Sequence, residues 1–499
     1  MGRPTKEGVS RFDGGMVPDI RTKTDRGFHI SVHFDGFTNP KRLTPYRSSE
    51  ANEDKTFNIV KFLAAFDGSL TQIFGLGVVS GTSRAKIFQK AGGTLAARIT
   101  GAWTGSTSGE QTGGTARNEK IFFTYKSYLY GWRDGTTIWR WGDFTASPTF
   151  TDSYQSITYT DVAQPVHHPA DDVAYFFSDN KVHSLNNITW SSNVLTLPDN
   201  LIITDGEPVG NLLAISCKPK AAGGKSVVFL WDRDSSLATI SGKIDWGEGD
   251  LIYIGNLDGL LVGVTDYHLS VASLSLERGK LIIKIANGEK AKNIKEIQET
   301  DSDERKIAPT AFNKTVKDNK MYFTAAMNDE NNTWRGVAVV DSEGRVTFDY
   351  VEEDASGSVE SAYLVGNNWF IAHSADGSVQ RTDDSANYTY TSIYQSQKFF
   401  GRTPAVTKKL LAVTVTTPPL PTAGQIVLKY RKDAETVWTT IFTLTTDNSI
   451  RKSATAKADG TNLPQYKEIQ FRIESTGNAE VTGLDLMSEE IPDDIHDYG

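Results

Sequence analysis

The amino-acid sequence predicts an all-β fold: an irregular β-propeller-like body with an extended N-terminal arm and a C-terminal β-sandwich. From about residue 56 to residue 400, short apolar, aromatic and β-branched runs alternate with turns rich in Gly, Asp, Asn and Ser, which is the signal of strands and hairpins. These hairpin units begin roughly 40 to 65 residues apart, close to the repeat of four-stranded propeller blades. We therefore divide the chain into an arm (residues 1–50), a propeller-like domain (51–400) and a sandwich domain with an acidic tail (401–499).

The first 50 residues carry many charged, Thr and Pro residues between scattered apolar side chains. Such a segment buries too little apolar surface to fold alone, so we expect it to be extended. Two interpretations remain open. The segment is either a mobile terminus or an arm that becomes ordered on a neighbouring surface and joins adjacent subunits.

Within the propeller-like region, a strand, a tight turn and a returning strand recur. Ile121–Tyr125 and Tyr128–Trp132 form one such pair, and Val173–Phe177 and Val182–Leu185 form another. Further runs of this kind are Ile138–Trp141, Val227–Trp231, Leu251–Ile254, Leu260–Val262, Lys320–Phe323, Gly336–Val340 and Trp369–Ala372. Six or seven irregular blades fit this spacing, although no literal sequence repeat connects them, and a pair of β-sandwiches would share the same local signals.

Two short segments have helical features. In Asn58–Phe66 the apolar residues fall at helical spacing, so we expect a helix there, with a strand as the alternative. The charged span Glu289–Glu299 predicts either a second helix or a solvated loop.

A domain boundary is expected near residue 400, where Gly401–Pro404 precede the apolar run Lys409–Thr416. The later runs alternate between apolar and polar residues, the pattern of half-buried strands in a small antiparallel sandwich. They are Ile426–Tyr430, Trp438–Phe442, Ile469–Ile473 and Val481–Leu486. The tail Glu489–Asp497 is acidic and is expected to be exposed.

Composition and charge limit the possible partners. The 499 residues carry a formal net charge of −9, which disfavours tight binding to a phosphate backbone. An acidic channel wall would nevertheless let DNA slide past without sticking. No stretch approaches the ~18 apolar residues of a transmembrane helix or has the form of a signal peptide, so we expect no membrane span and no export by such a signal.

No motif indicates a catalytic, cofactor-binding or metal-binding residue, so we expect a protein that is not an enzyme and needs no cofactor or metal. The sequence lacks a Gly-x-Ser-x-Gly elbow, a phosphate-binding loop and a His-Glu-x-x-His motif. His167 and His168 are interpreted as a loop feature before Pro169. The single cysteine, Cys217, lies in an apolar run and is interpreted as a small buried side chain, which excludes a disulfide within the chain.

Carboxylates keep one enzymatic alternative open. Glycosidases use two facing carboxylates, and Asp245, Glu248 and Asp250 lie close together in the sequence. Because the chain has 61 acidic residues, acidic residues close together in the sequence are expected without any catalytic role. We therefore prefer to interpret this stretch as a turn between strands.

Aromatic residues suggest a possible sugar-binding platform, formed by Tyr128, Tyr130, Trp132, Trp139 and Trp141. Residues two apart in a strand share a face, so Trp139 and Trp141 are expected to lie together. Packing between blades is the preferred interpretation of this group, because large aromatic side chains are used more often in this way.

Segments at both ends of the propeller-like region carry a family resemblance. They are Phe12–Gly15, which leads to Pro40–Pro45, and Tyr390–Gly401, which leads into the sandwich. Together they resemble virion proteins of tailed phages in which a propeller is combined with other β-rich modules, such as the tail nozzle (tail tubular) proteins of short-tailed phages. The resemblance covers most of the chain in layout and rests on short motifs.

This resemblance implies a structural protein of a phage tail or head–tail connector. Such a protein forms a homo-oligomeric ring, often of six copies, that is part of the DNA exit conduit and lets DNA pass without sequence-specific binding. Its partners would be other virion proteins, namely an adaptor or portal ring and tail fibres. Its location would be the virion tail, after assembly in the host cytoplasm. One alternative is a receptor- or carbohydrate-binding tail protein, with or without glycan-cleaving activity, and another is a cellular propeller scaffold.

Overall fold

The structure, a computed structural model, describes residues 5–12, 28–35, 39, 41–46, 49–51, 57–67, 71–79, 85–91, 94–97, 122–133, 137–143, 149–234, 240–247, 249–265, 268–277, 280–283, 292–296, 306–328, 333–342, 345–351, 359–365, 368–373, 379–382, 390–400 and 405–491. The regular elements in these residues are all β-strands, as the sequence predicts. The chain divides into two units: unit 1 is Met1–Ser48, Arg345–Val351 and Asp383–Gly499, and unit 2 is Ser49–Gly344 and Glu352–Thr382.

Seven small antiparallel sheets, here called blades 1 to 7, are formed by the described strands between β5 and β33. Within each blade the strands pair in chain order; in addition β26 pairs with β24, and β5 is the last strand of blade 7. Blade 1 consists of β6 (Phe57–Asp67), β7 (Thr71–Val79), β8 (Ala85–Ala91) and β9 (Thr94–Ala97). Blade 2 consists of β10 (Phe122–Tyr125), β11 (Tyr128–Arg133), β12 (Thr137–Gly142) and β13 (Thr149–Ser156). Blade 3 consists of β14 (Val162–His168), β15 (Val173–Ser178), β16 (Lys181–Asn186) and β17 (Thr189–Thr196).

The strands of blades 4 to 7 follow in the same way. Blade 4 consists of β18 (Leu201–Val209), β19 (Leu212–Pro219), β20 (Ser226–Trp231) and β21 (Ile240–Gly247), and blade 5 of β22 (Leu251–Leu257), β23 (Leu260–Thr265), β24 (His268–Glu277), β25 (Lys280–Ile283) and β26 (Lys292–Glu296). Blade 6 consists of β27 (Lys306–Lys317), β28 (Lys320–Asn328), β29 (Thr333–Asp341) and β30 (Val346–Val351). Blade 7 consists of β31 (Val359–Val365), β32 (Asn368–His373), β33 (Val379–Thr382) and β5 (Ser49–Ala51).

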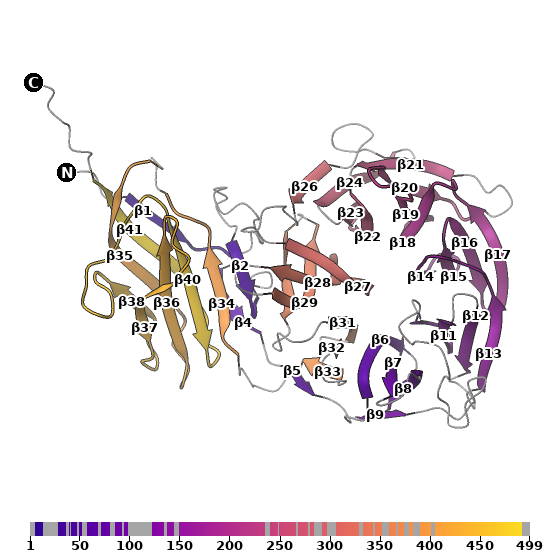
Figure 1. The fold of residues 1–499 in the computed structure, drawn as a ribbon, viewed down its shortest axis with the longest axis horizontal. Coiled ribbons are helices and arrows are strands. Elements are labelled where there is room, and N and C mark those ends of the chain that lie inside the picture. Colours follow the sequence, from indigo (N-terminus) through magenta and orange to yellow (C-terminus); the bar gives the residue numbers. More distant parts are fainter. Residues whose placement is uncertain are drawn as a thin grey trace, which may run out of the picture. The chain divides into compact units, whose positions relative to one another are not determined.

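The blades form a closed ring, which confirms the predicted propeller. The first strand of each blade contacts the first strand of the next, in the order β6, β10, β14, β18, β22, β27 and β31, and β31 contacts β6 again. Figure 1 shows the labelled first strands, β6, β14, β18, β22, β27 and β31, lining the inside of the ring. The ring is also closed by hydrogen bonding, because β5 precedes blade 1 in the sequence but completes blade 7, where Glu50 lies opposite Arg381.

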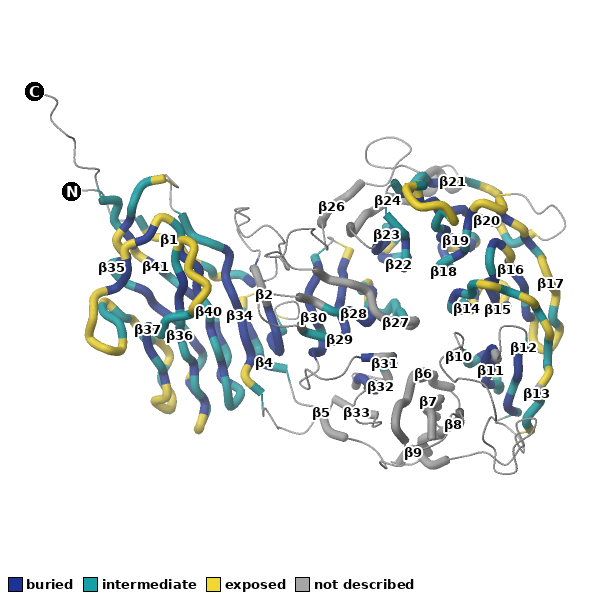
Figure 2. The backbone as a smooth tube through the Cα atoms, viewed as in Figure 1, coloured by how far each residue is buried: buried dark blue, intermediate teal, exposed yellow. Residues whose placement is uncertain are grey.

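Burial follows the position of a strand within its blade. Every residue of β15, the second strand of blade 3, is buried, whereas most of β17, the outermost strand, is exposed (Figure 2). The apolar core between blades 3 and 4 includes Phe177, Leu213 and Trp231. Apolar burial of this kind is the main force that holds neighbouring blades together.

Glycines let large side chains approach neighbouring strands closely. A Cβ atom on Gly206 of blade 4 would lie 2.5 Å from Cζ of Phe177 in blade 3. A Cβ atom on Gly263 of blade 5 would overlap the indole ring of Trp246 in blade 4. Each glycine thus leaves space for an aromatic ring from the preceding blade.

The sandwich consists of two five-stranded sheets. The first has the order β1-β41-β35-β38, with β39 also paired to β35, and the second has the order β2-β34-β40-β36-β37. The strands are β1 (Thr5–Val9), β2 (Phe28–Val32), β34 (Ser392–Ser396), β35 (Lys408–Thr416), β36 (Gln425–Lys432), β37 (Thr439–Leu444), β38 (Arg451–Ala454), β39 (Gln465–Tyr466), β40 (Ile469–Thr476) and β41 (Gly483–Glu490), with β3 (Phe34–Asp35) and β4 (Thr44–Pro45) as a separate pair. The propeller is therefore inserted in sequence between strands of the sandwich.

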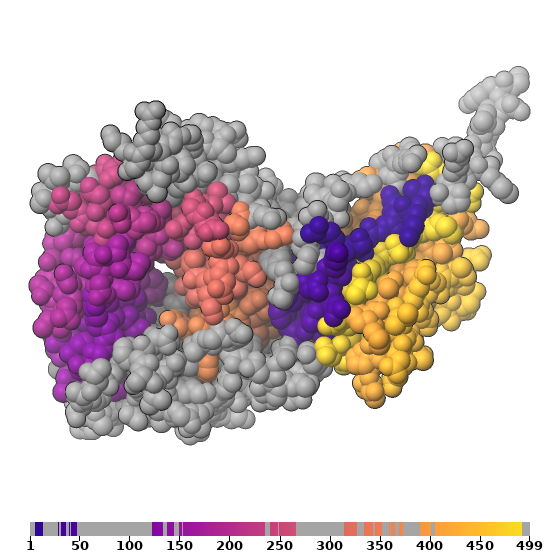
Figure 3. Space-filling view, turned by 180° about the vertical axis from the view of Figure 1, so that it is seen from behind, coloured from indigo at the N-terminus to yellow at the C-terminus, as the bar shows by residue number. Residues whose placement is uncertain are grey.

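Strands β1 and β2, within the first 48 residues, belong to the two sheets of the sandwich, which differs from the separate extended arm that we expect from the sequence. β1 pairs along β41, with Gly8 opposite Asp485, and Figure 3 shows the indigo N-terminal strand lying along the yellow strands of the same sheet. Phe12 is fully buried, with its ring edge-on to Tyr394 at a centroid distance of 5.3 Å. Strand β41 supplies hydrogen-bond partners for the backbone of β1, and Tyr394 supplies an apolar contact for Phe12. The N-terminal segment is therefore ordered by contacts within its own chain.

The expected helix at Asn58–Phe66 is wrong, because these residues lie in strand β6. The pairing of β6 with β7 shifts register between Phe57 and Ile59 and again between Val60 and Phe62. These irregularities break the two-residue period of a strand and leave apolar residues at a spacing that resembles a helix. In the second expected helix, Lys292–Glu296 form strand β26, and the other residues of Glu289–Glu299 lie outside the described part of the chain.

Candidate functional site

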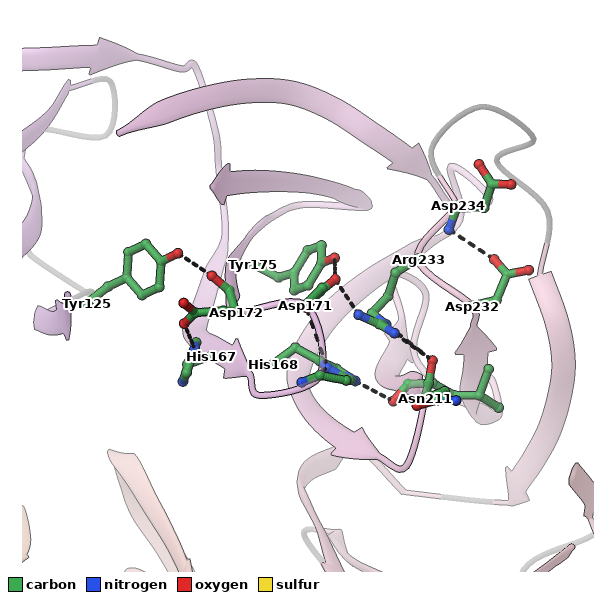
Figure 4. A network of polar contacts seen from close by, with 12 residues as sticks. Tyr125, His167, His168, Asp171, Asp172, Tyr175, Asn211, Asp232, Arg233 and Asp234 are labelled. Carbon is green, nitrogen blue, oxygen red and sulfur yellow. Dashed lines mark hydrogen bonds and ion pairs between the residues drawn. The ribbon is translucent and has the colours of Figure 1, made fainter. Parts of the chain in front are cut away.

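A cluster of polar side chains surrounds the turn between β14 and β15, and we call it the junction cluster. His167 and His168 end β14, Pro169 begins the turn, and Asp171 and Asp172 precede β15. The turn therefore places two imidazoles and two carboxylates within six residues (Figure 4). Side chains from blades 2 and 4 complete the cluster.

Asp172 connects the turn to blade 2. Its Oδ1 lies 2.8 Å from Nε2 of His167, and its Oδ2 forms an ion pair with Lys126, which lies in the turn between β10 and β11. The hydroxyl of Tyr125 donates a hydrogen bond to the Asp172 carbonyl and accepts one from the Asn187 amide at 3.2 Å. Hydrogen bonds from Lys126 and then His167 hold the pKa of Asp172 below its usual value, so this carboxylate is ionised at neutral pH.

Asp171 connects the same turn to blade 4. Its Oδ2 accepts a hydrogen bond from the Tyr175 hydroxyl at 2.8 Å and forms an ion pair with Arg233, which follows β20. The Nε and Nη2 atoms of Arg233 also donate to the carbonyl of Asn211, at 3.2 and 3.0 Å. Burial and the neighbouring Asp171 raise the pKa of Tyr175, so its hydroxyl remains a donor.

His168 is buried and is engaged on both ring nitrogens. Its Nε2 lies 3.0 Å from the carbonyl of Leu212, and its Nδ1 accepts a hydrogen bond from the Ala170 amide at 3.3 Å. Burial lowers the pKa of His168, which fits a neutral ring with its proton on Nε2. A general base needs an available nitrogen lone pair, and in His168 that lone pair is used within the turn.

The contacts of the junction cluster join three consecutive blades, because its bonds run from one turn of blade 3 to blades 2 and 4. Its buried groups already have partners within the chain, as Figure 4 shows for Asp171, Arg233 and His168. Among the described residues, no group of three or more His, Cys, Asp or Glu side chains is arranged to hold a metal ion. The geometry therefore fits a structural junction.

The carboxylates considered for glycosidase chemistry have separate ion-pair partners. Asp245 lies 3.1 Å from Nζ of Lys243, and Asp250 lies 3.1 Å from Nζ of Lys218. Glu248 lies outside the described residues. Cys217 is buried, as its apolar surroundings in the sequence indicate, and burial raises its pKa far above that of a reactive thiol.

The aromatic group considered for sugar binding lies mostly inside the blades. Tyr130, Trp132 and Trp139 are fully buried, Trp141 is nearly so, and Tyr128 is partly buried. Trp132 packs edge-on against Tyr159 with ring centroids 4.6 Å apart, and Tyr130 contacts Phe176 of the next blade. Tyr130 and Trp132 belong to the core between blades 2 and 3, as the preferred interpretation of packing between blades predicts, whereas Trp139 contacts Phe122 and Phe150 of its own blade.

A second polar centre lies on the innermost strands of blades 4 to 6, and no sequence motif predicts it. Nζ of Lys314, on β27, lies 2.6 Å from Oδ2 of Asp205 and 2.9 Å from Oε2 of Glu207, both on β18. It also donates to the carbonyls of Gly206 and Ile254. We call Asp205, Glu207 and Lys314 the inner triad; 109 residues separate Asp205 from Lys314, so no local motif marks it.

No helix in the described residues is long and apolar enough to cross a membrane.

Comparisons with known proteins show only distant similarities. No protein-family model matches the chain, and no curated protein matches it. Among solved structures the chain is similar to Sqt1 of Saccharomyces cerevisiae, with a TM-score of 0.38 and 10% identity over 67% of this chain and 98% of that one. It is also similar to YCF48 of Cyanidioschyzon merolae, with a TM-score of 0.38 and 9% identity over the same shares of the two chains.

Proposed function

We propose that this chain is a structural, non-enzymatic subunit of a phage tail or head–tail connector, which assembles into a nozzle-like ring around part of the DNA exit path. Its partners would be further copies of itself, an adaptor or portal ring and tail fibres. It would act in the virion tail after assembly in the host cytoplasm.

The main observation that supports this proposal is that the segments on which the family resemblance rests lie together in the sandwich unit. Phe12 packs on Tyr394, which belongs to the exit segment Tyr390–Gly401. In the segment Pro40–Pro45, Leu43 exchanges backbone hydrogen bonds with Val481 at 2.8 and 3.1 Å, and Arg42 forms an ion pair with Glu480 at 2.8 Å. Segments distant in sequence thus build one module around an inserted propeller, the kind of layout on which the resemblance rests.

The polar contacts of the propeller support a mechanical role. The junction cluster links blades 2, 3 and 4, and the inner triad links blades 4 and 6. Closure of the ring also leaves few exposed sheet edges, which suits a rigid structural module. The net charge of −9 suits a surface along which DNA passes without binding.

The test is the mass of the purified full-length protein in solution, measured by multi-angle light scattering and followed by negative-stain electron microscopy. We expect a particle whose mass is a whole-number multiple of the 54.8 kDa chain and which appears as a ring. A single-chain mass at all concentrations would contradict a self-assembling ring.

The sandwich structure also determines which variants suit this test. Deletion of residues 1–48 would remove strands β1 and β2 from their sheets, so loss of the ring could reflect misfolding. Substitution of the exposed Met487 by Lys changes the surface of β41 while leaving the core intact. If this face is an interface between copies, the ring mass falls while the folded spectrum is retained.

A further inference from the structure

We propose that Lys314 and Asp205 of the inner triad become joined by an isopeptide bond, with Glu207 as the group that transfers protons. The product is a covalent link between blade 4 and blade 6 of the propeller. This inference goes beyond the proposed function, because the reaction takes place within one chain and does not depend on ring assembly.

The reacting groups are already adjacent. Nζ of Lys314 lies 2.6 Å from Oδ2 of Asp205, and a C–N bond of about 1.33 Å requires only a further approach of the amine to the carboxyl carbon. Both residues lie next to irregular pairing, between Ile203 and Asp205 in β18 and between Pro309 and Lys314 in β27. Bulges redirect side chains, and here they direct an amine and a carboxyl group toward each other.

The third member of the triad supplies a proton acceptor at the same amine. Oε2 of Glu207 lies 2.9 Å from Nζ of Lys314, and Oε1 of Glu207 accepts a hydrogen bond from the Asn256 amide at 3.3 Å. Asp205 is held at both oxygens, because Oδ2 accepts from the Ile254 amide at 2.9 Å and Oδ1 from the Gly206 amide at 2.8 Å. These backbone donors fix the carboxyl group and polarise it, as donors do in acyl-transfer sites.

Burial favours the uncharged product. The side chains of Lys314, Asp205 and Glu207 are only 12%, 5% and 10% exposed. One ammonium faces two carboxylates, so the triad carries one excess negative charge in a site where charges are poorly solvated. Amide formation removes one positive and one negative charge from this interior.

Burial favours the protonated form of Asp205 that the reaction needs. Burial raises the pKa of Asp205 to about 6, even though Lys314 acts in the opposite direction, so a protonated carboxyl forms in mildly acidic solution. Burial alone would lower the pKa of Lys314, but the attraction of Asp205 and Glu207 outweighs it, and the net shift is upward. Lys314 is therefore an ammonium before the reaction, and one of its protons must be removed before the nitrogen can attack.

The step balances without an added reagent. Glu207 takes a proton from the Lys314 ammonium, and the neutral amine attacks Cγ of protonated Asp205. The new C–N bond forms as the C–OH bond breaks. Glu207 gives its proton to the departing hydroxyl, which leaves as water, and takes up the proton released by the nitrogen. One amine and one carboxylic acid become one amide and one water, with no change in oxidation state.

The test is the mass of the folded full-length protein, denatured after incubation at pH 6 and measured intact. We expect a mass lower by one water than the sequence requires. After proteolysis, tandem mass spectrometry should show a branched peptide in which the segment containing Asp205 is joined to the segment containing Lys314. The full sequence mass, with no branched peptide, would overturn the proposal and leave the triad as an ion pair only.

Three variants separate this chemistry from any other loss of water. Lys314→Arg keeps a cation but removes the primary amine, so the branched peptide should be absent. Asp205→Asn should give the same linkage with loss of ammonia in place of water. Glu207→Gln keeps the shape of the site but cannot accept the proton, so linkage should be slowed at least tenfold; an unchanged rate would refute its role.

The matched control is Lys218→Arg, which alters the half-exposed ion pair with Asp250 and should leave the branched peptide unchanged. Circular dichroism reports whether each variant folds. If Lys314→Arg does not fold, the mass of the unaltered protein still decides the question.

Discussion

His183 is a buried residue that makes the stability of the propeller depend on pH. Its Nε2 lies 2.8 Å from the Ser178 hydroxyl, its Nδ1 accepts from the Asn193 amide at 3.2 Å, and its ring stacks on Trp190. Burial, followed by the charge of Lys181, lowers its pKa from 6.5 to about 4. The unfolded chain therefore binds more protons than the folded chain between these pH values, and stability decreases as the pH falls through this window.

We predict that His183→Gln makes the stability of the propeller decrease less between pH 7 and pH 4.5, because the variant lacks one of the groups that must remain unprotonated. The His183 contribution is on the order of 3 kcal/mol across the full window. Urea unfolding at several pH values, followed by tryptophan fluorescence, measures it. Ser178→Ala serves as the control, since it should lower stability while the slope with pH is retained. An equal slope in His183→Gln and the unaltered protein would refute the prediction.

Gly263 is a residue at which one added methyl group should lower the stability of the propeller. Trp246 of blade 4 occupies the place that a Cβ atom would take. We predict that Gly263→Ala lowers the free energy of unfolding by about 1–3 kcal/mol, the usual cost of overpacking. Gly483→Ala is the control, since its nearest neighbours would lie 3.8 Å away. Thermal unfolding of both variants measures the difference, and equal melting temperatures would contradict this account.

Among the elements, the short strand β5 completes the last blade of the ring. Its three residues pair with β33 and join the start of the propeller to its last blade. Proline disrupts such pairing because it lacks the N–H group and restricts the backbone. We predict that Glu50→Pro lowers the melting temperature of the propeller and increases amide exchange at Val379–Thr382, whereas Glu50→Thr does neither. Hydrogen exchange measured by mass spectrometry would detect the change, and protection unaltered by proline would show that closure does not depend on β5.

Most individual strands could be predicted from local sequence. Val173–Phe177 is a continuous apolar run between polar turns, and it forms the fully buried strand β15. Strand β6 was misread because its register shifts disturb the alternation that identifies a strand. Pairings between distant segments, such as β1 with β41, leave no local signal, because backbone hydrogen bonds do not depend on side-chain identity.

The same limit applies to the polar centres. The two histidines and two aspartates of the junction cluster are adjacent in the sequence, so the turn itself could be recognised. Its partner Arg233 comes from the next blade, and the inner triad joins β18 to β27. Only the closure of the ring brings these residues together.

At the scale of the whole molecule, the insertion of the propeller predicts how fragments behave. Residues 49–382 contain every strand of the seven blades, including β5, so this fragment should fold and unfold cooperatively. Residues 383–499 lack β1 and β2, which leaves the edges of β41 and β34 unpaired. We predict that the second fragment aggregates alone and becomes soluble when a peptide of residues 1–48 is added. Solubility and circular dichroism with and without the peptide provide the test, and a stable fragment 383–499 without the peptide would contradict it.

The insertion also sets an order of events on the ribosome. Strands β1 and β2 are synthesised before the blades, but their partners β41 and β34 are made only after the last blade. The nascent chain must therefore keep β1 and β2 unpaired while the blades are translated. Chaperones that bind extended segments would have their longest opportunity at these two strands, and the yield of the protein would depend on the speed of translation through the blades.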